Sequence, residues 1–224
     1  MYVAILVVGF LLLAAYASVS ISAGIYVKAF CRAKSSSKAI ALTFDDGPDP
    51  VWTPKVLEVL KKYDVKATFF CIGDKVDKHP LLVKQLIGEG HLIGNHTYYH
   101  TSFFPLLSRK KMVAELQRCD EAIKNAVGEP VALFRPPFGV TKPTIAASVR
   151  ELGYKVVGWS IRSFDTVKSE REKVLRRILK KAHAGGVILM HDNLENSDWL
   201  VEQVIVNLHE QGYEIKRLDE LFEI

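Results

Sequence analysis

The chain has 224 residues, of which 49% are hydrophobic and 25% are charged, with a formal net charge of +5. This length suits one domain with a sizeable core, and the composition excludes disordered, collagen-like and low-complexity chains. Three cysteines without a CxxC pair argue against a disulfide framework or a cysteine-based zinc site and favour buried free thiols.

The positive charge is confined to one short stretch. The first 27 residues contain no acidic or basic side chain and no histidine. The next segment contains Lys28, Arg32, Lys34 and Lys38 and no acid, and without these four the chain has 26 basic against 25 acidic residues. The charge therefore borders an apolar segment and gives no reason to expect nucleic-acid binding.

The apolar segment predicts a transmembrane anchor over residues 1–27, because a bilayer-spanning helix needs roughly 20 apolar residues. A cleaved signal peptide is the alternative: Ala15-Tyr16-Ala17 is a small-x-small site, although no basic residue precedes the run. The basic flank would place the rest of the chain in the cytoplasm, whereas the chemistry described below favours the cell envelope. We expect a basic polar linker over residues 28–38 and the folded domain over residues 39–224.

From residue 39 onward, short β-rich runs alternate with amphipathic helical stretches. This alternation indicates right-handed βαβ units with parallel strands, in a small barrel or an open doubly wound sheet. Thr53 before Pro54, and Ser169 with Glu172, predict helix starts. Strands are expected at Ala39–Phe44, Ala67–Ile72, Leu92–Asn95, Ala132–Arg135, Lys155–Ser160, Val187–His191 and Tyr213–Lys216, and helices at Thr53–Tyr63, Pro80–Glu89, Ser108–Val127, Lys142–Leu152, Ser169–Ala184 and Trp199–Glu210.

Polar residues follow nearly every predicted strand, at the strand ends where α/β barrels build their active sites. Asp45 and Asp46 come after the first strand and precede a Gly-Pro turn, although turn formation alone would also favour these residue types. His96 and His100 follow the third strand, and at this spacing they could share one face of a helical turn and bind one metal ion. Two histidines and a carboxylate with open positions are typical of hydrolytic metal sites.

Two further segments end predicted strands. Arg135 opens the segment RPPFG, where it could pair with a carboxylate, and the turn could direct a backbone N–H at a ligand. In isolation, a rigid loop with a structural salt bridge is the better explanation of this segment. His191 ends the apolar run of ILMHD and would project into the same mouth of the barrel.

The ordered motifs TFDDGP, HTYYH, RPPFG and ILMHD resemble those of the polysaccharide deacetylases, carbohydrate esterases that remove N-acetyl groups from chitin-like and peptidoglycan-like sugars. The resemblance extends over residues 39–224. It implies an α/β fold, a distorted (β/α)₇ barrel, that holds one divalent metal ion, with Zn²⁺ as the expected ion. It also implies an N-acetylglucosamine-containing glycan as the substrate.

The resemblance assigns the reacting groups by position. Asp46, His96 and His100 are similar to the metal ligands of the family. Asp45 is similar to the general base that deprotonates the attacking water.

It also assigns the supporting groups. His191 resembles the general acid that protonates the departing amine, and Asp165 the carboxylate that pairs with it. Arg135 resembles the residue that orients the base. The backbone N–H of Phe138 would bind the developing oxyanion, and Leu189 would form part of the pocket for the acetyl methyl.

The fourth motif of the family is altered in this chain. Residues 159–166 read WSIRSFDT, where the family usually ends the motif in Asp-Trp. Thr166 therefore replaces an aromatic residue, and Arg162 stands where an acidic residue is common. Phe138 replaces a frequent tyrosine. The catalytic set is intact, but the surface that would face the substrate is altered.

Taken with the apolar N-terminal segment, the resemblance implies a metal-dependent N-deacetylase held at the cell membrane, with its catalytic domain facing the envelope. One alternative is a catalytically silent glycan-binding module on the same fold, which the retention of all the catalytic positions argues against. Another is a cytosolic amidase or deformylase acting on a small molecule, which the basic flank at Lys28 would support.

Overall fold

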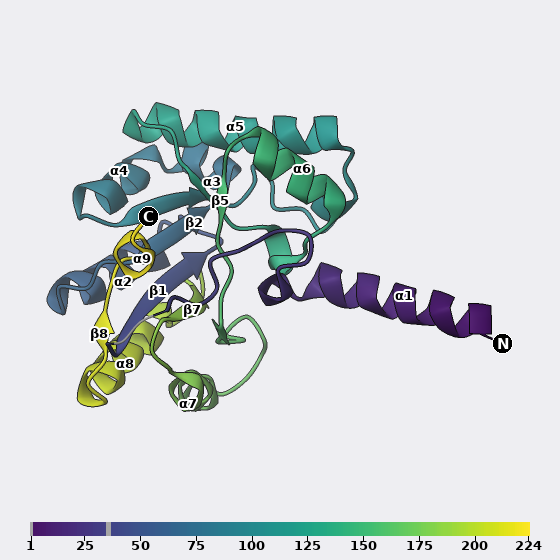
Figure 1. Ribbon diagram of the computed structural model, residues 1–224. Coiled ribbons are helices and arrows are strands. Elements are labelled where there is room, and N and C mark those ends of the chain that lie inside the picture. Colours follow the sequence, from purple (N-terminus) through teal and green to yellow (C-terminus); the bar gives the residue numbers. More distant parts are fainter. Residues whose placement is uncertain (1, 35–36) are drawn as a thin grey trace.

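A computed structural model of the protein describes residues 2–34 and 37–224, and within them eight strands form one sheet. All strand pairings in this sheet are parallel. The strand order is β5-β4-β3-β2-β1-β7-β6, with β8 paired to β1 (Figure 1). The strands are β1 (Ala39–Asp45), β2 (Thr68–Cys71), β3 (Leu92–Asn95), β4 (Leu133–Phe134), β5 (Lys155–Val156), β6 (Ile161–Arg162), β7 (Gly186–His191) and β8 (Glu214–Ile215).

The sheet is a half-closed barrel, which confirms the predicted α/β fold with parallel strands. Its edge strands β5 and β6 are consecutive in the chain. Only the first two residues of the predicted strand Lys155–Ser160 form a strand, β5, and β6 begins just after the predicted strand ends. Val157 N donates to Phe134 O on the β4 side, while Ser160 N donates to Val187 O on the β7 side. The chain thus crosses between the two edges within a few residues.

Helices cover the outside of the sheet (Figure 1). Their apolar faces are packed onto it, as in α2, where Val56, Leu57 and Leu60 are buried. The helices after the N-terminal one are α2 (Trp52–Lys62), α3 (Gly73–Lys78), α4 (Pro80–Gly88), α5 (Arg109–Val127), α6 (Pro143–Glu151), α7 (Arg171–Lys181), α8 (Ser197–Glu210) and α9 (Leu218–Phe222).

Two predicted helix caps are wrong. Helix α7 begins at Arg171 after Glu170, so Ser169 and Glu172 do not form a capping box. Helix α2 begins at Trp52, and the hydroxyl of Thr53 donates to Asp192 instead of capping the helix. The observed helix starts themselves lie within one or two residues of the predicted ones, which is the ordinary variation of a helix end.

The central strand β1 positions the site. All seven of its residues are buried, as expected for a parallel strand covered on both faces. It pairs with β7 so that Asp45 lies level with His191, and with β2 on its other side. The carboxyl ends of the neighbouring strands therefore meet at one edge of the sheet.

The N-terminal helix α1 (Tyr2–Val19) projects from the domain (Figure 1). Its large apolar side chains are exposed, as at Phe10, which is 70% exposed. The inner end is fixed, because Thr141 donates its N–H to Ser18 O and its hydroxyl to Ala17 O, both over 2.9 Å. No helix in the described part of the chain is long and apolar enough to cross a membrane, so the predicted transmembrane anchor lacks structural support.

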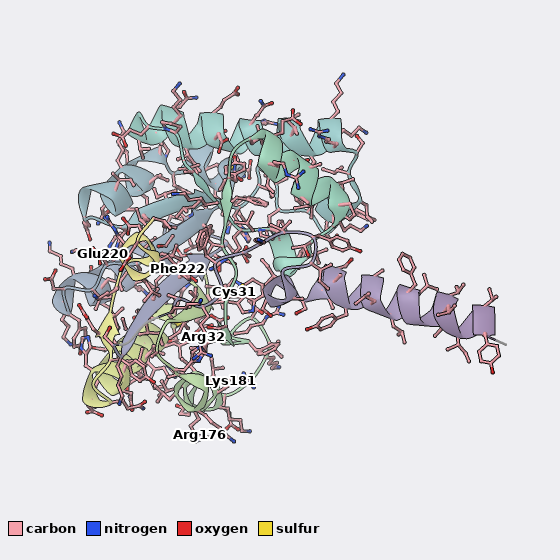
Figure 2. The ribbon with its side chains drawn as sticks, in the orientation of Figure 1. Cys31, Arg32, Arg176, Lys181, Glu220 and Phe222 are labelled. Atoms are coloured by element: carbon pink, nitrogen blue, oxygen red, sulfur yellow. The ribbon has the colours of Figure 1, made fainter. Side chains whose placement is uncertain are left out.

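The segment predicted as a linker packs on the domain where it is described. Phe30 forms a parallel bridge with Val157, and Arg32 an antiparallel bridge with Gly186. The ring of Phe30 also lies 5.1 Å from that of Phe222, so this segment runs beside the C-terminal helix α9 (Figure 2). Residues 35–36 of the predicted linker lie outside the described residues.

Candidate active site

The predicted site residues come together at the carboxyl ends of the central strands. Asp45 ends β1, and His191 ends β7 beside it. His96 directly follows β3, and Arg135 directly follows β4. The βα alternation accounts for this convergence, because parallel strands bring all their carboxyl ends to one edge.

Asp46, His96 and His100 form a group that fits a metal ion. The Asp46 Oδ1 atom lies 3.5 Å from His96 Nε2 and 3.5 Å from His100 Nε2. One ligand atom from each residue lies within 4.8 Å of the others. Asp46 Oδ1 is buried and has no hydrogen-bond partner, which is unfavourable unless a cation satisfies it. The donor set is that of a hydrolytic divalent-metal site.

The two histidines do not share a helical turn, so that part of the prediction is wrong. Residues 96–100 form a loop in which Thr97 and His100 have φ values of 67° and 50°. Hydrogen bonds hold this left-handed backbone: Thr97 N donates to Asn95 Oδ1, and His100 N donates to Thr97 Oγ1. The loop brings the two imidazole rings to 4.5 Å, with both Nε2 atoms towards Asp46.

His96 is set up as a neutral ligand. Its Nδ1 lies 2.7 Å from the carbonyl oxygen of Arg135, which can only accept, so Nδ1 carries the proton. The Nε2 lone pair is then free to bind a metal ion. Burial, with a smaller contribution from His100, lowers the pKa of His96 to about 3, which keeps the imidazole neutral near pH 7.

Asp45 is held by Arg135. The guanidinium Nη1 donates to Asp45 Oδ1 over 2.7 Å and to Thr43 Oγ1 over 2.9 Å. Its remaining donors reach the carbonyl oxygens of Val157 and Gly158. Burial lowers the pKa of Arg135, and the Asp45 carboxylate opposes that shift. With Oδ1 engaged, Asp45 presents Oδ2 towards the metal ligands, 3.7 Å from His96 Nε2.

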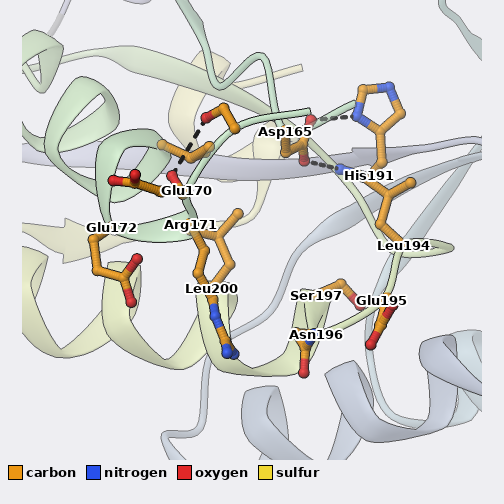
Figure 3. Close-up of a pocket in the computed structure, with 12 residues that line it drawn as sticks. Asp165, Glu170, Arg171, Glu172, His191, Leu194, Glu195, Asn196, Ser197 and Leu200 are labelled. Carbon is orange, nitrogen blue, oxygen red and sulfur yellow. Dashed lines mark hydrogen bonds and ion pairs between the residues drawn. The ribbon is translucent and has the colours of Figure 1, made fainter. Parts of the chain in front are cut away.

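His191 is held by Asp165 (Figure 3). Its Nδ1 lies 2.8 Å from Asp165 Oδ1, and its backbone N–H donates to Asp165 Oδ2 over 2.8 Å. Burial lowers the pKa of His191, but the hydrogen bond and charge of Asp165, together with the charges of Asp45 and Asp46, raise it to about 9. The imidazole is therefore protonated at neutral pH, with Nε2 3.9 Å from Asp46 Oδ2.

The two predicted substrate contacts lie around this group. Phe138 has a φ of 60° and is 49% exposed, and its ring lies 4.9 Å from that of His100. Leu189 is buried on β7, level with Thr43 of β1.

A cavity of about 470 Å³ opens beside His191 and Asp165. It lies between the start of α7 and the start of α8, and Figure 3 shows acidic side chains on both sides of it. These are Glu170 and Glu172 on one side and Glu195 on the other, with Arg171 among them.

Two residues at the site, Lys75 and Asp192, were not predicted from the sequence. Lys75 Nζ donates to Asp46 O over 2.7 Å and so holds the backbone of that carboxylate. Asp192 is buried, accepts a 2.5 Å hydrogen bond from Thr53, and has its other oxygen without a partner. Burial raises the pKa of Asp192 to about 7. The position of Asp192 directly after His191 was the available signal, whereas no local pattern marked Lys75.

Comparison with known proteins gives a consistent result. The polysaccharide deacetylase family profile matches residues 32–157, more than half of the chain. A peptidoglycan-N-acetylglucosamine deacetylase of Bacillus cereus is 36% identical, covering 84% of this chain and 89% of that protein. A peptidoglycan-N-acetylmuramic acid deacetylase of Bacillus subtilis is 35% identical, covering 86% and 74%. The solved structure of the Bc1960 peptidoglycan N-acetylglucosamine deacetylase matches with a TM-score of 0.81 and 30% identity, covering 86% of this chain and 92% of that one.

Proposed function

Because the chain belongs to the polysaccharide deacetylase family, whose hydrolases act on N-acetyl amide bonds, we propose that it deacetylates an N-acetylglucosamine-containing glycan of the peptidoglycan type. One observation carries this proposal: a carboxylate held by Arg135, a three-residue metal group and a protonated histidine meet at one edge of the sheet. The names of the relatives favour peptidoglycan over chitin as the substrate.

Asp46, His96 and His100 would hold one divalent ion, for which Zn²⁺ suits two imidazoles and a carboxylate. Such an ion supplies Lewis acidity, which lowers the pKa of water and polarises the amide carbonyl. The chain itself orients these ligands: Arg135 O fixes the tautomer of His96, and Lys75 fixes the backbone of Asp46.

Asp45 would act as the general base and take the proton of the attacking water at Oδ2. Arg135 engages Oδ1, so a single oxygen points into the site and the carboxylate cannot rotate freely. A general base contributes about 10²–10⁴ to the rate when it lies within reach of the proton that it removes.

His191 would act as the general acid. It begins protonated because Asp165 raises its pKa, and it can donate the Nε2 proton to the departing amine as the C–N bond breaks. The negative charge that develops on the carbonyl oxygen needs donors, and the backbone N–H of Phe138 is the proposed one.

We further propose that α1 attaches the domain to a membrane on the envelope side. The helix contains no charged residue. Its large apolar side chains, such as those of Leu11 and Leu12, are exposed. A helix that is apolar all round is buried in protein or lipid. Co-sedimentation of the full chain with phospholipid vesicles tests this: a Leu11→Lys, Leu12→Lys variant should stay in the supernatant. Equal sedimentation of both proteins contradicts it.

Acetate release tests the enzymatic proposal. The full chain, loaded with Zn²⁺, is incubated with peptidoglycan-derived oligosaccharides, chitin oligomers and small N-acetyl sugars. We expect release from the first class, and loss of at least about 100-fold in turnover for Asp45→Asn with metal binding retained. Metal-loaded protein that releases acetate from none of these would favour the silent glycan-binding module. Release from small N-acetyl compounds alone would favour the amidase.

A further inference from the structure

Arg162 lies on the face of the sheet that carries the site. On β6 it is level with Leu189 of β7, which is in turn level with Thr43 of β1. Residues level with one another on neighbouring parallel strands point to the same face. Thr43 contacts Arg135 in the barrel interior, so the side chain of Arg162 projects to that side as well, at the open end of the strand.

The guanidinium of Arg162 lies between two aromatic rings. Its carbon is 5.5 Å from the ring centroid of Trp159 and 4.8 Å from that of Phe164. Trp159 also contacts residues of the site. The guanidinium carbon of Arg135 lies 5.7 Å from the centroid of its ring, and Gly139, the neighbour of Phe138 in the chain, packs against that ring. Arg162 is therefore part of the mouth of the site.

Phe164 is presented to solvent by a left-handed backbone. Its φ is 58° and its side chain is 38% exposed, although it directly precedes the buried carboxylate of Asp165. A second guanidinium, that of Arg177 on α7, lies 5.3 Å from the ring and donates to Ser163 O over 2.8 Å. A positive value of φ at a phenylalanine is unfavourable, so the surrounding contacts hold the ring in this position.

Arg162 is exposed, and no carboxylate of the described residues pairs with it. The carboxylates of the site are already engaged: Asp45 pairs with Arg135, and Asp165 pairs with His191. An unpaired guanidinium beside an exposed aromatic ring offers a planar fork for a carboxylate and an apolar surface for a sugar ring.

We propose that Arg162 binds a carboxylate carried by the glycan, namely the lactyl carboxylate of a muramic acid residue, while Phe164 packs against a sugar ring. This inference rests on the proposed function and names the substrate class of the same site. It predicts that the enzyme prefers anionic peptidoglycan strands to neutral chitin-like strands of equal length.

The test compares matched oligosaccharides. Peptide-free peptidoglycan oligosaccharides are used with the lactyl carboxylate intact or converted to its neutral methylamide. We expect the kcat/KM for the carboxylate form to be about three- to tenfold higher, the range between an exposed ion pair and a charge-assisted hydrogen bond. The preference should fall as salt is added. Arg162→Gln should bring the ratio to about one, and Arg162→Lys should retain part of it.

Arg176→Gln is the matched control, because Arg176 is an exposed arginine of α7 and its loss should leave the ratio unchanged. The proposal is wrong if the wild-type protein does not distinguish the two forms, or if Arg162→Gln retains the preference. A preference seen only in oligosaccharides that keep their stem peptides would assign the carboxylate to the peptide and overturn the lactyl assignment.

Binding separates this proposal from the proposed function. Calorimetric titration of the Asp45→Asn protein with the two oligosaccharides measures their Kd values without turnover. We expect the Kd of the carboxylate form to be about three- to tenfold lower than that of the methylamide. This difference should disappear in the double variant that carries both Asp45→Asn and Arg162→Gln. If no acetate is released from any substrate but this preference is present, the enzymatic proposal fails and the carboxylate subsite stands. Equal Kd values overturn the subsite.

Discussion

The guanidinium of Arg135 donates a 2.7 Å hydrogen bond to Asp45 Oδ1, and both side chains are buried. Arg135 comes from the loop after β4, whereas Asp45 ends β1, and β2 and β3 lie between these strands in the sheet. The pair therefore joins two distant strands across the barrel interior. It leaves Asp45 Oδ2 as the atom that faces the metal group.

Arg135→Lys should separate positioning from charge. Lysine keeps the positive charge but has no planar fork, so it cannot hold Asp45, Thr43 and the two backbone carbonyls together. We expect kcat to fall about 100-fold, as for a misplaced catalytic group, while metal content stays unchanged. Steady-state kinetics and metal analysis measure both. Arg150→Lys, on the exposed face of α6, is the control, and equal kcat values for the two variants would contradict the role of Arg135.

His96→Ala should abolish metal binding. The imidazole supplies one of the three donors of the group, and the contact of Nδ1 with Arg135 O leaves the Nε2 lone pair free for the ion. Zn²⁺ content after dialysis against a weak chelator measures the loss, and thermal unfolding with and without Zn²⁺ should show the ion stabilising the wild-type protein only. His209→Ala, at an exposed position of α8, should bind the metal normally. Full metal content in His96→Ala would show that the ligand assignment is wrong.

Asp165→Asn should move the alkaline limb of the pH–rate profile to lower pH. The Asp165 carboxylate raises the pKa of His191 to about 9, against the lowering effect of burial. Activity that needs protonated His191 is present below that pKa and is lost as the pH rises through it. Removing the carboxylate lowers the pKa, so the loss should begin at a more acidic pH. An unchanged limb in kcat profiles measured from pH 5 to 10 would exclude His191 as the titrating acid.

Asp192→Asn should change how stability depends on pH. Burial raises the pKa of Asp192 to about 7 from an ordinary value of 3.8, so the folded protein favours the neutral acid. Protonated Asp192 therefore contributes to the stability of the folded protein. This contribution is complete below 3.8, the pKa of the carboxyl in the unfolded chain, and it is lost as the pH rises through about 7, its pKa in the folded protein. Asparagine cannot ionise, so the variant should gain stability relative to wild type between pH 4 and 8, by up to roughly 4 kcal/mol. Denaturant unfolding of both proteins at pH 4 and at pH 8 measures this difference in stability.

The control for that experiment is Asp64→Asn, since the Asp64 side chain is 93% exposed. Its difference from wild type should be nearly independent of pH. If Asp192→Asn behaves in the same way, Asp192 is ionised in the folded protein at neutral pH and the buried-acid interpretation is wrong.

The sequence alone predicts the βα alternation and shows which residue types stand at the strand ends. Asp45 and His96 follow predicted strands, Arg135 and His191 end them, and parallel strands must bring their carboxyl ends to one edge. Local patterns suffice for such predictions, because hydrophobic periodicity and turn residues are properties of short segments. For the same reason, short strands that depend on pairing partners, such as β6, were not found.

How these side chains face one another depends on contacts that form only in the folded chain. The approach of His96 and His100 depends on left-handed residues held by Asn95 and Thr97, and not on a helical turn. The place of Arg162 in the mouth depends on its register with Leu189, a residue distant in the chain. Register and buried hydrogen bonds are set by contacts between distant segments, and the free energy of those contacts is not encoded in any local pattern.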